Sequence, residues 1–214
     1  MNYWEADSYT IAELKQQIED EIILIPSYQR GVVWNKKDQE KLINSIKNGY
    51  PFGAFLIYYD KKTNRKQIID GLQRATTIMS FTSDPGKYLS ESAVSDESIK
   101  AFLTKMKLRG DLEERKKQIK KLISDWIQKE FTDVDKVKSI QYYHLYKYMK
   151  EKDGTFENYH DEIIETFEDE LNILKELTED IYNKKIPVIH VYGDEKNLPE
   201  IFKRINTLGK KLRK

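Results

Sequence analysis

The spacing of apolar residues near the start of the chain predicts two amphipathic helices. Ile11, Leu14 and Ile18 recur three or four positions apart, which places them on one face of a short helix. A longer helix is predicted over residues 36–47, where Asn35 can cap the first turn and apolar positions again recur at helical spacing. Both helices are expected to pack one face against a core.

Between and after these helices, the pattern changes to short apolar runs of strand length. Residues 21–26 (EIILIP) predict a buried strand that the proline ends. Residues 54–70 (AFLIYYDKKTNRKQIID) predict an antiparallel hairpin whose second strand ends at Asp70. Residues 186–192 (IPVIHVY) predict a last strand, which we expect to rejoin the first strands because a lone strand is not stable.

From residue 95 to residue 183 the apolar positions follow helical spacing throughout, which predicts four or so helices. The expected fold class is therefore α/β (α+β), with a small mixed sheet and a large helical insertion. The predicted core comprises residues 1–90 and 184–214, and the predicted insertion comprises residues 91–183.

The composition indicates a well-solvated chain with a real core. Of the 214 residues, 34% are charged and 39% are apolar, and no apolar run approaches the roughly 20 residues of a membrane helix. The first residues lack the basic start and apolar core of a signal peptide. The absence of cysteine excludes disulfides, thiolate catalysis and cysteine-bound zinc. We therefore expect a cytoplasmic protein without a membrane partner.

The net charge of +1 conceals an uneven distribution. Residues 115–121 (RKKQIKK) and 203–214 are strongly basic, whereas residues 157–170 are strongly acidic. The basic segments are either solvated helix faces or contacts for nucleic-acid phosphates, and the acidic segment is either a solvated face or a mimic of nucleic acid.

The sequence IIDGLQRATTI contains the most informative local pattern, because a buried strand ends at Asp70–Gly71 and a helix follows. Such a helix start exposes unpaired N–H groups at the positive end of the helix dipole, which favours anions such as phosphate. Gly71 allows close approach of the backbone, Arg74 can take a bidentate phosphate contact, and Asp70 can hold a magnesium ion or orient a water. Equally, Asp70 could cap the helix and pair with Arg74.

Two other segments combine an arginine with amide side chains. They contain Tyr28, Gln29, Arg30 and Trp34 in the first, and Arg204, Asn206 and Gly209 in the second. In a functional interpretation Arg30 contacts phosphate while Tyr28 or Trp34 stacks on a base. In a structural interpretation Arg30 satisfies backbone carbonyls, Trp34 belongs to the core, and the second segment ends a helix.

In this order, IPSYQRGVVW, IIDGLQRATTI and FKRINTLGKKL resemble the amino-terminal domain of GmrSD-type Type IV restriction enzymes and of SspE-like defence proteins. That family belongs to the ParB/sulfiredoxin-like superfamily, so the resemblance implies a ParB-like core that carries all three motifs. It covers nearly the whole chain, from the first helix to Leu212.

The resemblance also implies site residues. The family motif DGQQR corresponds to Asp70, Gly71, Gln73 and Arg74, with Leu72 where the family commonly has glutamine, so hydrolysis could be weakened while binding persists. Asp70, Gln73 and Arg74 are the expected catalytic residues, and Asp70 is the expected metal ligand. The expected nucleotide-binding residues are Tyr28, Gln29, Arg30, Trp34, Gly71, Arg74, Thr76, Thr77, Arg204, Asn206 and Gly209.

The implied function is a nucleotide-binding module in bacterial defence against phage or modified DNA. Its expected ligand is a nucleoside triphosphate (NTP), ATP or GTP, with Mg²⁺; whether the chain is a nucleoside triphosphatase stays open. Family members often continue into a His-Asn-His nuclease domain. The histidines of this chain, His144, His160 and His190, do not have the spacing of that nuclease motif. The expected partner is thus a nuclease domain or subunit, and the alternative is a ParB-like DNA-binding module without turnover.

Overall fold

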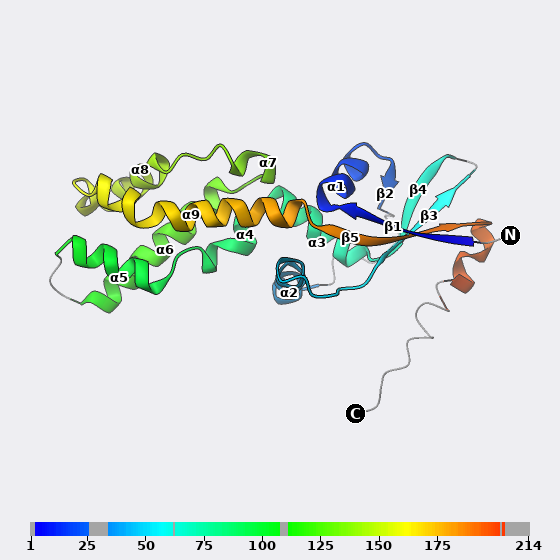
Figure 1. The fold of residues 1–214 in the computed structure, drawn as a ribbon, viewed down its shortest axis with the longest axis horizontal. Coiled ribbons are helices and arrows are strands. Elements are labelled where there is room, and N and C mark those ends of the chain that lie inside the picture. The colour runs from blue at the N-terminus through cyan, green and yellow to red at the C-terminus, as the bar shows by residue number, and fades with distance from the viewer. Residues whose placement is uncertain (1–2, 26–33, 62, 108–110, 202, 204–214) are drawn as a thin grey trace, which may run out of the picture. The chain divides into compact units, whose positions relative to one another are not determined.

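The structure is a computed structural model that describes residues 3–25, 34–61, 63–107, 111–201 and 203 (Figure 1). The chain divides into two compact units. The first comprises residues 1–79 and 183–214, and the second comprises residues 80–182. The mixed α+β class predicted from the sequence is confirmed, whereas the predicted domain limits and the ParB-like assignment stay predictions.

The first unit contains a five-stranded mixed sheet in the order β1-β5-β3-β4-β2 (Figure 1). The pairs β1–β5 and β3–β4 are antiparallel, whereas β3–β5 and β2–β4 are parallel. The last strand therefore rejoins the sheet, as the sequence predicted, and lies between β1 and β3. The strands are β1 (Tyr3–Thr10), β2 (Ile23–Leu24), β3 (Phe55–Asp60), β4 (Arg65–Asp70) and β5 (Lys185–Tyr192).

Three helices accompany this sheet: α1 (Ile11–Glu19), α2 (Lys36–Lys47) and α3 (Leu72–Ser83). The predicted start of α2 is confirmed, because the Asn35 side chain accepts a hydrogen bond from the N–H of Asp38 at 3.0 Å. On one face of the sheet, Lys66 Nζ donates to Gln17 Oε1 of α1 at 3.3 Å. The other face has a small apolar cluster of Tyr58, Ile69, Val191 and Leu198, against which Ile201 packs.

The structure differs from the sequence analysis at two strands: one predicted strand is shorter than expected, and one strand was not predicted. The strand predicted over residues 21–26 is reduced to Ile23–Leu24, and the side chains of Ile22 and Ile25 are exposed on either side. Conversely, the edge strand β1 was missed because it is polar and mostly exposed, so it has no continuous apolar run. Its pairing with β5 runs from Tyr3–Tyr192 to Thr10–Lys185, so tertiary pairing, not local pattern, defines it.

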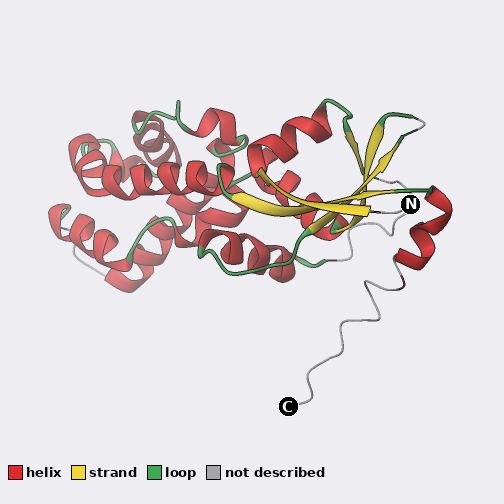
Figure 2. Cartoon of the chain, turned by 45° about the vertical axis from the view of Figure 1, so that its right-hand side comes forward, coloured by secondary structure: helices red, strands yellow, loops and turns green. Residues whose placement is uncertain are grey.

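In its described residues the second unit consists of helices and connections, drawn red and green in Figure 2. Its core includes an aromatic cluster, in which Phe102 lies 5.3 Å from Phe167 and 6.2 Å from Phe156, measured between ring centroids. The helices are α4 (Gly86–Leu89), α5 (Asp96–Lys105), α6 (Leu112–Glu130), α7 (Val134–Val137), α8 (Tyr143–Lys152) and α9 (His160–Tyr182), with 3₁₀ turns at Ser90–Ser92 and Gly154–Phe156.

Candidate functional site

The turn between β4 and α3 has an irregular backbone. Leu56 pairs with Asp70 whereas Ile57 pairs with Ile68, so one extra residue of β4 lies between these pairs as a β-bulge. Gly71 follows with a φ angle of 99°, and α3 begins at Leu72. A bulge re-aims the side chains next to it, and positive φ favours glycine. The chain therefore turns sharply at Asp70 and Gly71, where the DGLQR motif begins.

Arg74 is held by contacts within this turn. Its Nη2 donates to Asp70 Oδ2 at 2.9 Å, and its Nη1 donates to the carbonyl of Phe52 at 3.2 Å. The guanidinium also lies 5.2 Å from the ring centroid of Phe55. The Arg74 side chain is 14% exposed, whereas that of Asp70 is 41% exposed. The pairing of Asp70 with Arg74, one of the two interpretations of the sequence, is thus present, and the acid keeps access to solvent.

Two glycines leave room for this arginine. A Cβ atom on Gly53, whose φ is 88°, would lie 2.7 Å from Arg74 Nη1. A Cβ atom on Gly71 would lie 2.8 Å from the ring of Phe55 and 3.2 Å from Arg74 Nη2. Both positions therefore need glycine, for conformation and for space.

Gln73 connects the turn to the segment before α2. Its Oε1 accepts a hydrogen bond from the backbone N–H of Trp34 at 3.2 Å, and Gln39 Nε2 donates to the Trp34 carbonyl at 3.2 Å. The structure thus brings Trp34, predicted from a different motif, to the DGLQR turn. The sequence interpretation missed Phe52, Gly53 and Gln39. Phe52 contributes through its backbone carbonyl, Gly53 through the lack of a side chain, and Gln39 through an amide on a helix, and none of these forms a recognisable motif.

The two threonines of the motif lie further along α3. Each hydroxyl donates to a backbone carbonyl one turn earlier, from Thr76 to Leu72 at 2.9 Å and from Thr77 to Gln73 at 2.8 Å. Thr77 is 1% exposed, so its side chain belongs to the interior in this structure. Thr76 is partly exposed.

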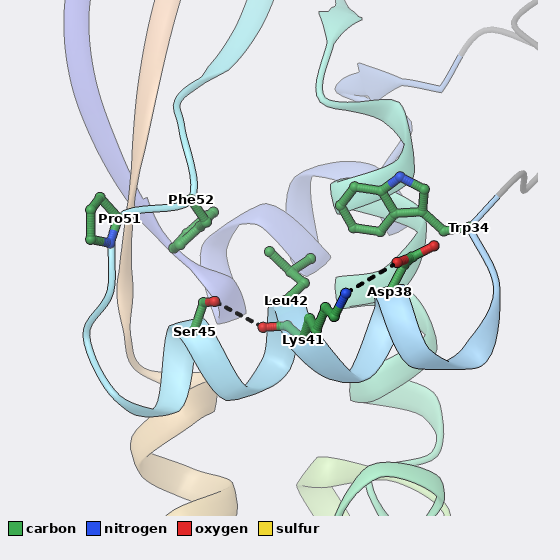
Figure 3. A pocket seen from close by; sticks show the side chains of 7 residues that line it. All are labelled: Trp34, Asp38, Lys41, Leu42, Ser45, Pro51 and Phe52. Carbon is green, nitrogen blue, oxygen red and sulfur yellow. Dashed lines mark hydrogen bonds and ion pairs between the residues drawn. The ribbon is translucent and has the colours of Figure 1, made fainter. Parts of the chain in front are cut away.

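A pocket of about 430 Å³ opens beside the turn (Figure 3). Figure 3 shows Trp34 and Phe52 on opposite sides of it, with Leu42 between them. The polar side chains of Asp38, Lys41 and Ser45 project from α2 along one border, and Pro51 completes the lining. Sequence reasoning did not predict these α2 residues as part of a site.

The remaining predicted residues lie outside the described part of the chain. They are Tyr28, Gln29, Arg30, Arg204, Asn206 and Gly209. The predicted meeting of three arginines around one phosphate-sized pocket stays a prediction for Arg30 and Arg204.

The basic segment at residues 115–121 is largely paired with acids of the same helical unit. Arg115 Nη1 lies 2.7 Å from Asp153 Oδ2, and both Lys116 and Lys120 contact Asp96, at 2.7 and 3.1 Å. These ion pairs favour the interpretation of this segment as a helix face over that of a phosphate-binding surface. The basic residues 204–214 lie outside the described part.

Two features that the described residues lack bear on the class of site. They contain no helix long and apolar enough to cross a membrane. Nor do they contain a group of three or more His, Cys, Asp or Glu side chains placed to hold a metal ion. A metal at this turn would therefore need ligands from another source in addition to Asp70.

The fold and the turn define an α+β protein with an acid, a glycine and an arginine gathered where a strand leads into a helix. A family model described as the GmrSD restriction endonuclease N-terminal domain matches residues 11–214. The chain belongs to this family, as its motifs indicated, and membership implies a role in a restriction system. No curated protein matches the chain.

Proposed function

We propose that the chain is the nucleotide-binding module of a restriction system. Its ligand is an NTP, ATP or GTP, with Mg²⁺, and binding controls a nuclease domain or partner subunit. The observation that carries the proposal is the joining of Asp70, Gly71 and Arg74 in one sharp turn, beside a pocket with aromatic walls.

The start of α3 supplies the first phosphate contacts. The N–H of Ala75 bonds to the carbonyl of Gly71 at 2.8 Å, so the amides of Leu72, Gln73 and Arg74 precede the first internal helix bond. Such amides, together with the positive end of the helix dipole, favour an anion. Arg74 adds a full positive charge within the same turn, and a phosphate can replace part of its contact with Asp70.

Asp70 fits a metal that arrives with the nucleotide. A magnesium ion in nucleotide sites commonly takes one or two carboxylates, and the substrate phosphates and waters complete its shell. Asp70 offers a carboxylate that is 41% exposed at the turn. When bound, the ion would neutralise phosphate charge; Asp70 and Arg74 then place the phosphates. Gln73 acts through position, because it holds the backbone of Trp34.

The binding of nucleotide is tested by a thermal-shift panel of the chain with ATP, GTP, CTP and UTP, each with and without Mg²⁺. Because a ligand that binds the native state raises apparent stability, we expect a magnesium-dependent rise in Tm for at least one nucleotide. No rise at millimolar nucleotide would contradict the proposal. A rise with duplex DNA alone would instead support the alternative, a DNA-binding module without turnover.

A further inference from the structure

We propose that the pocket between Trp34 and Phe52 binds the nucleobase, and that Asp38 sets the preference among bases. The proposal rests on the proposed function, since it assigns the other end of the same ligand. It concerns residues of α2 that no motif singles out.

The pocket is connected directly to the DGLQR turn, where we propose that the phosphates bind. The wall formed by Trp34 is tied to it through the bond from the Trp34 N–H to Gln73 Oε1. The wall formed by Phe52 is tied to it through the bond from Arg74 Nη1 to the Phe52 carbonyl. Two neighbouring side chains of α3 therefore hold backbone groups at the two sides of the pocket, so we place the base of a nucleotide bound at the turn between these walls.

The lining suits a flat aromatic ring. Trp34 and Phe52 are partly exposed aromatic side chains, and Leu42, 5% exposed, provides an apolar surface between them (Figure 3). Aromatic side chains stack on any base, because every base has a π face. The volume of about 430 Å³ lies within the usual range for small-molecule pockets.

The polar border can recognise the edge of a base. Ser45 Oγ donates to the carbonyl of Lys41 at 2.8 Å, so toward a ligand this hydroxyl offers lone pairs. Asp38 is an acceptor and Lys41 is a donor, and their charged groups lie 3.9 Å apart, with the side chain of Lys41 exposed and that of Asp38 41% exposed. The border thus presents acceptors and one donor, which match the N–H and carbonyl groups of bases.

The carboxylate of Asp38 favours one base in particular. It offers two acceptor oxygens side by side, and guanine presents two adjacent N–H donors, on its ring nitrogen and its exocyclic amine. Lys41 can donate to the neighbouring carbonyl oxygen of guanine. Adenine, cytosine and uracil offer a single donor group on the corresponding edge.

Calorimetry with GTP and with tripolyphosphate, both with Mg²⁺, separates the base from the phosphates. The variant Ser45→Trp fills the pocket from a partly exposed position on α2, and Asn44→Trp adds the same ring to the adjacent, exposed position outside the lining. We expect Ser45→Trp to weaken GTP binding about tenfold or more without changing tripolyphosphate binding. Asn44→Trp should change neither.

The outcomes distinguish this proposal from the proposed function. If the wild-type chain binds neither ligand, the nucleotide function itself fails. If the wild-type chain binds both but Ser45→Trp and Trp34→Ala leave GTP affinity unchanged, the nucleotide function stands and the pocket assignment is wrong. Circular dichroism of each variant checks that the fold is retained.

Base preference is tested by Asp38→Asn, measured against all four nucleoside triphosphates. Because asparagine replaces one acceptor by a donor, guanine should lose more affinity than the other bases, by about tenfold. An equal change for all four nucleotides, or no change, would refute the role of Asp38.

Discussion

At the scale of single residues, the DGLQR motif acts first as a set of internal contacts. Arg74 joins the end of β4 to the loop before β3, because it contacts both Asp70 and the carbonyl of Phe52. Gln73 joins the same turn to Trp34. The motif therefore builds the site geometry with the same groups that the proposal assigns to the ligand, and substitutions should affect folding as well as binding.

The variant Gly71→Ala tests the closeness of this packing. Alanine at a φ of 99° is strained, and its Cβ would overlap the ring of Phe55. We expect the free energy of unfolding in urea to fall by about 2–4 kcal/mol. The control Gly49→Ala has a similar φ of 70° with nothing within 4 Å, so it should cost only about 1 kcal/mol. Equal costs for the two variants would contradict the packing described.

The variant Arg74→Lys tests the two-sided contact of the guanidinium. A lysine keeps the charge but cannot reach Asp70 and the Phe52 carbonyl with a planar fork. Urea unfolding should show a loss of about 1–3 kcal/mol, because a partly buried carbonyl loses its donor. In the exposed pair Lys105–Glu165, the variant Lys105→Met should change stability by less than about 1 kcal/mol. An unchanged free energy of unfolding in Arg74→Lys would show that the two-sided contact of the guanidinium is not needed for stability.

His190 gives the sheet a predictable response to pH. The residue is 6% exposed, its Nε2 lies 2.9 Å from the Tyr9 hydroxyl, and its Nδ1 has no hydrogen-bond partner in the described residues. Burial lowers the pKa of His190 below its ordinary value of 6.5, and the charge of Lys66 lowers it further, against the opposing effect of Asp7 and Glu5. The folded protein therefore favours the neutral imidazole.

Because the unfolded chain binds the proton more readily, stability should be complete above about pH 6.5 and decline as the pH falls below it. Comparing Tm between pH 5 and pH 8 should show a smaller decline for His190→Gln than for the wild type, although its Tm at pH 8 will be lower. The control His144→Gln changes an exposed histidine and should keep the wild-type slope. If Tm declined as much with falling pH in His190→Gln as in the wild type, His190 would not be the cause of the pH dependence.

At the scale of elements, α2 has a structural and a proposed functional role. Its apolar face, with Leu42, Ile43 and Ile46, is buried, while Asp38, Lys41 and Ser45 border the pocket. The Asn35 cap fixes the first turn and hence the position of Asp38. A loss of this cap should therefore affect both stability and the proposed base site.

The variant Asn35→Ala should lower the free energy of unfolding by about 1 kcal/mol, because the N–H of Asp38 loses its side-chain acceptor and keeps only the bond to the Asn35 backbone carbonyl at 3.1 Å. The control Asn44→Ala changes an exposed interior position of the same helix, where alanine is the better helix former. Urea unfolding should therefore show no loss, or a small gain, for the control. Equal losses in both variants would mean that the cap is not the cause.

The elements that were predicted correctly are those whose own sequence determines them. The limits of α2 follow from its cap and apolar spacing, and the hairpin of β3 and β4 follows from two apolar runs around a polar turn. The strand β1 could not be predicted, since pairing with β5 and not its own apolar pattern defines it. For the same reason the contact of Trp34 with Gln73, 39 positions later, had no local signal.

The candidate site was predictable only in its motif. Asp70, Gly71 and Arg74 could be found because an acid, a glycine and an arginine at a strand end form a recognisable pattern. The bulge before Asp70, the carbonyl of Phe52 and the pocket border on α2 depend on how distant segments pack. Only the folded arrangement reveals them.

At the scale of the whole molecule, the described chain consists of a sheet unit that carries the motif turn and a helical unit inserted between β4 and β5. The motif turn, the pocket and the sheet all belong to the first unit. The second unit contains the paired charges of residues 115–121 and part of the acidic segment, with Glu157 paired to Lys150 and Glu165 paired to Lys105. The ligand site we propose therefore belongs to the sheet unit.

The binding of a magnesium–nucleotide complex at the DGLQR turn is tested most directly by calorimetric titration of the wild-type chain and of Arg74→Ala. Arg74→Ala should retain its circular dichroism spectrum at a temperature below its lowered Tm, since the sheet core does not depend on this side chain alone. We expect saturable binding by the wild type and a loss of at least about tenfold in affinity for Arg74→Ala. Equal affinities in the two proteins would show that nucleotide, if bound, does not lie at this turn.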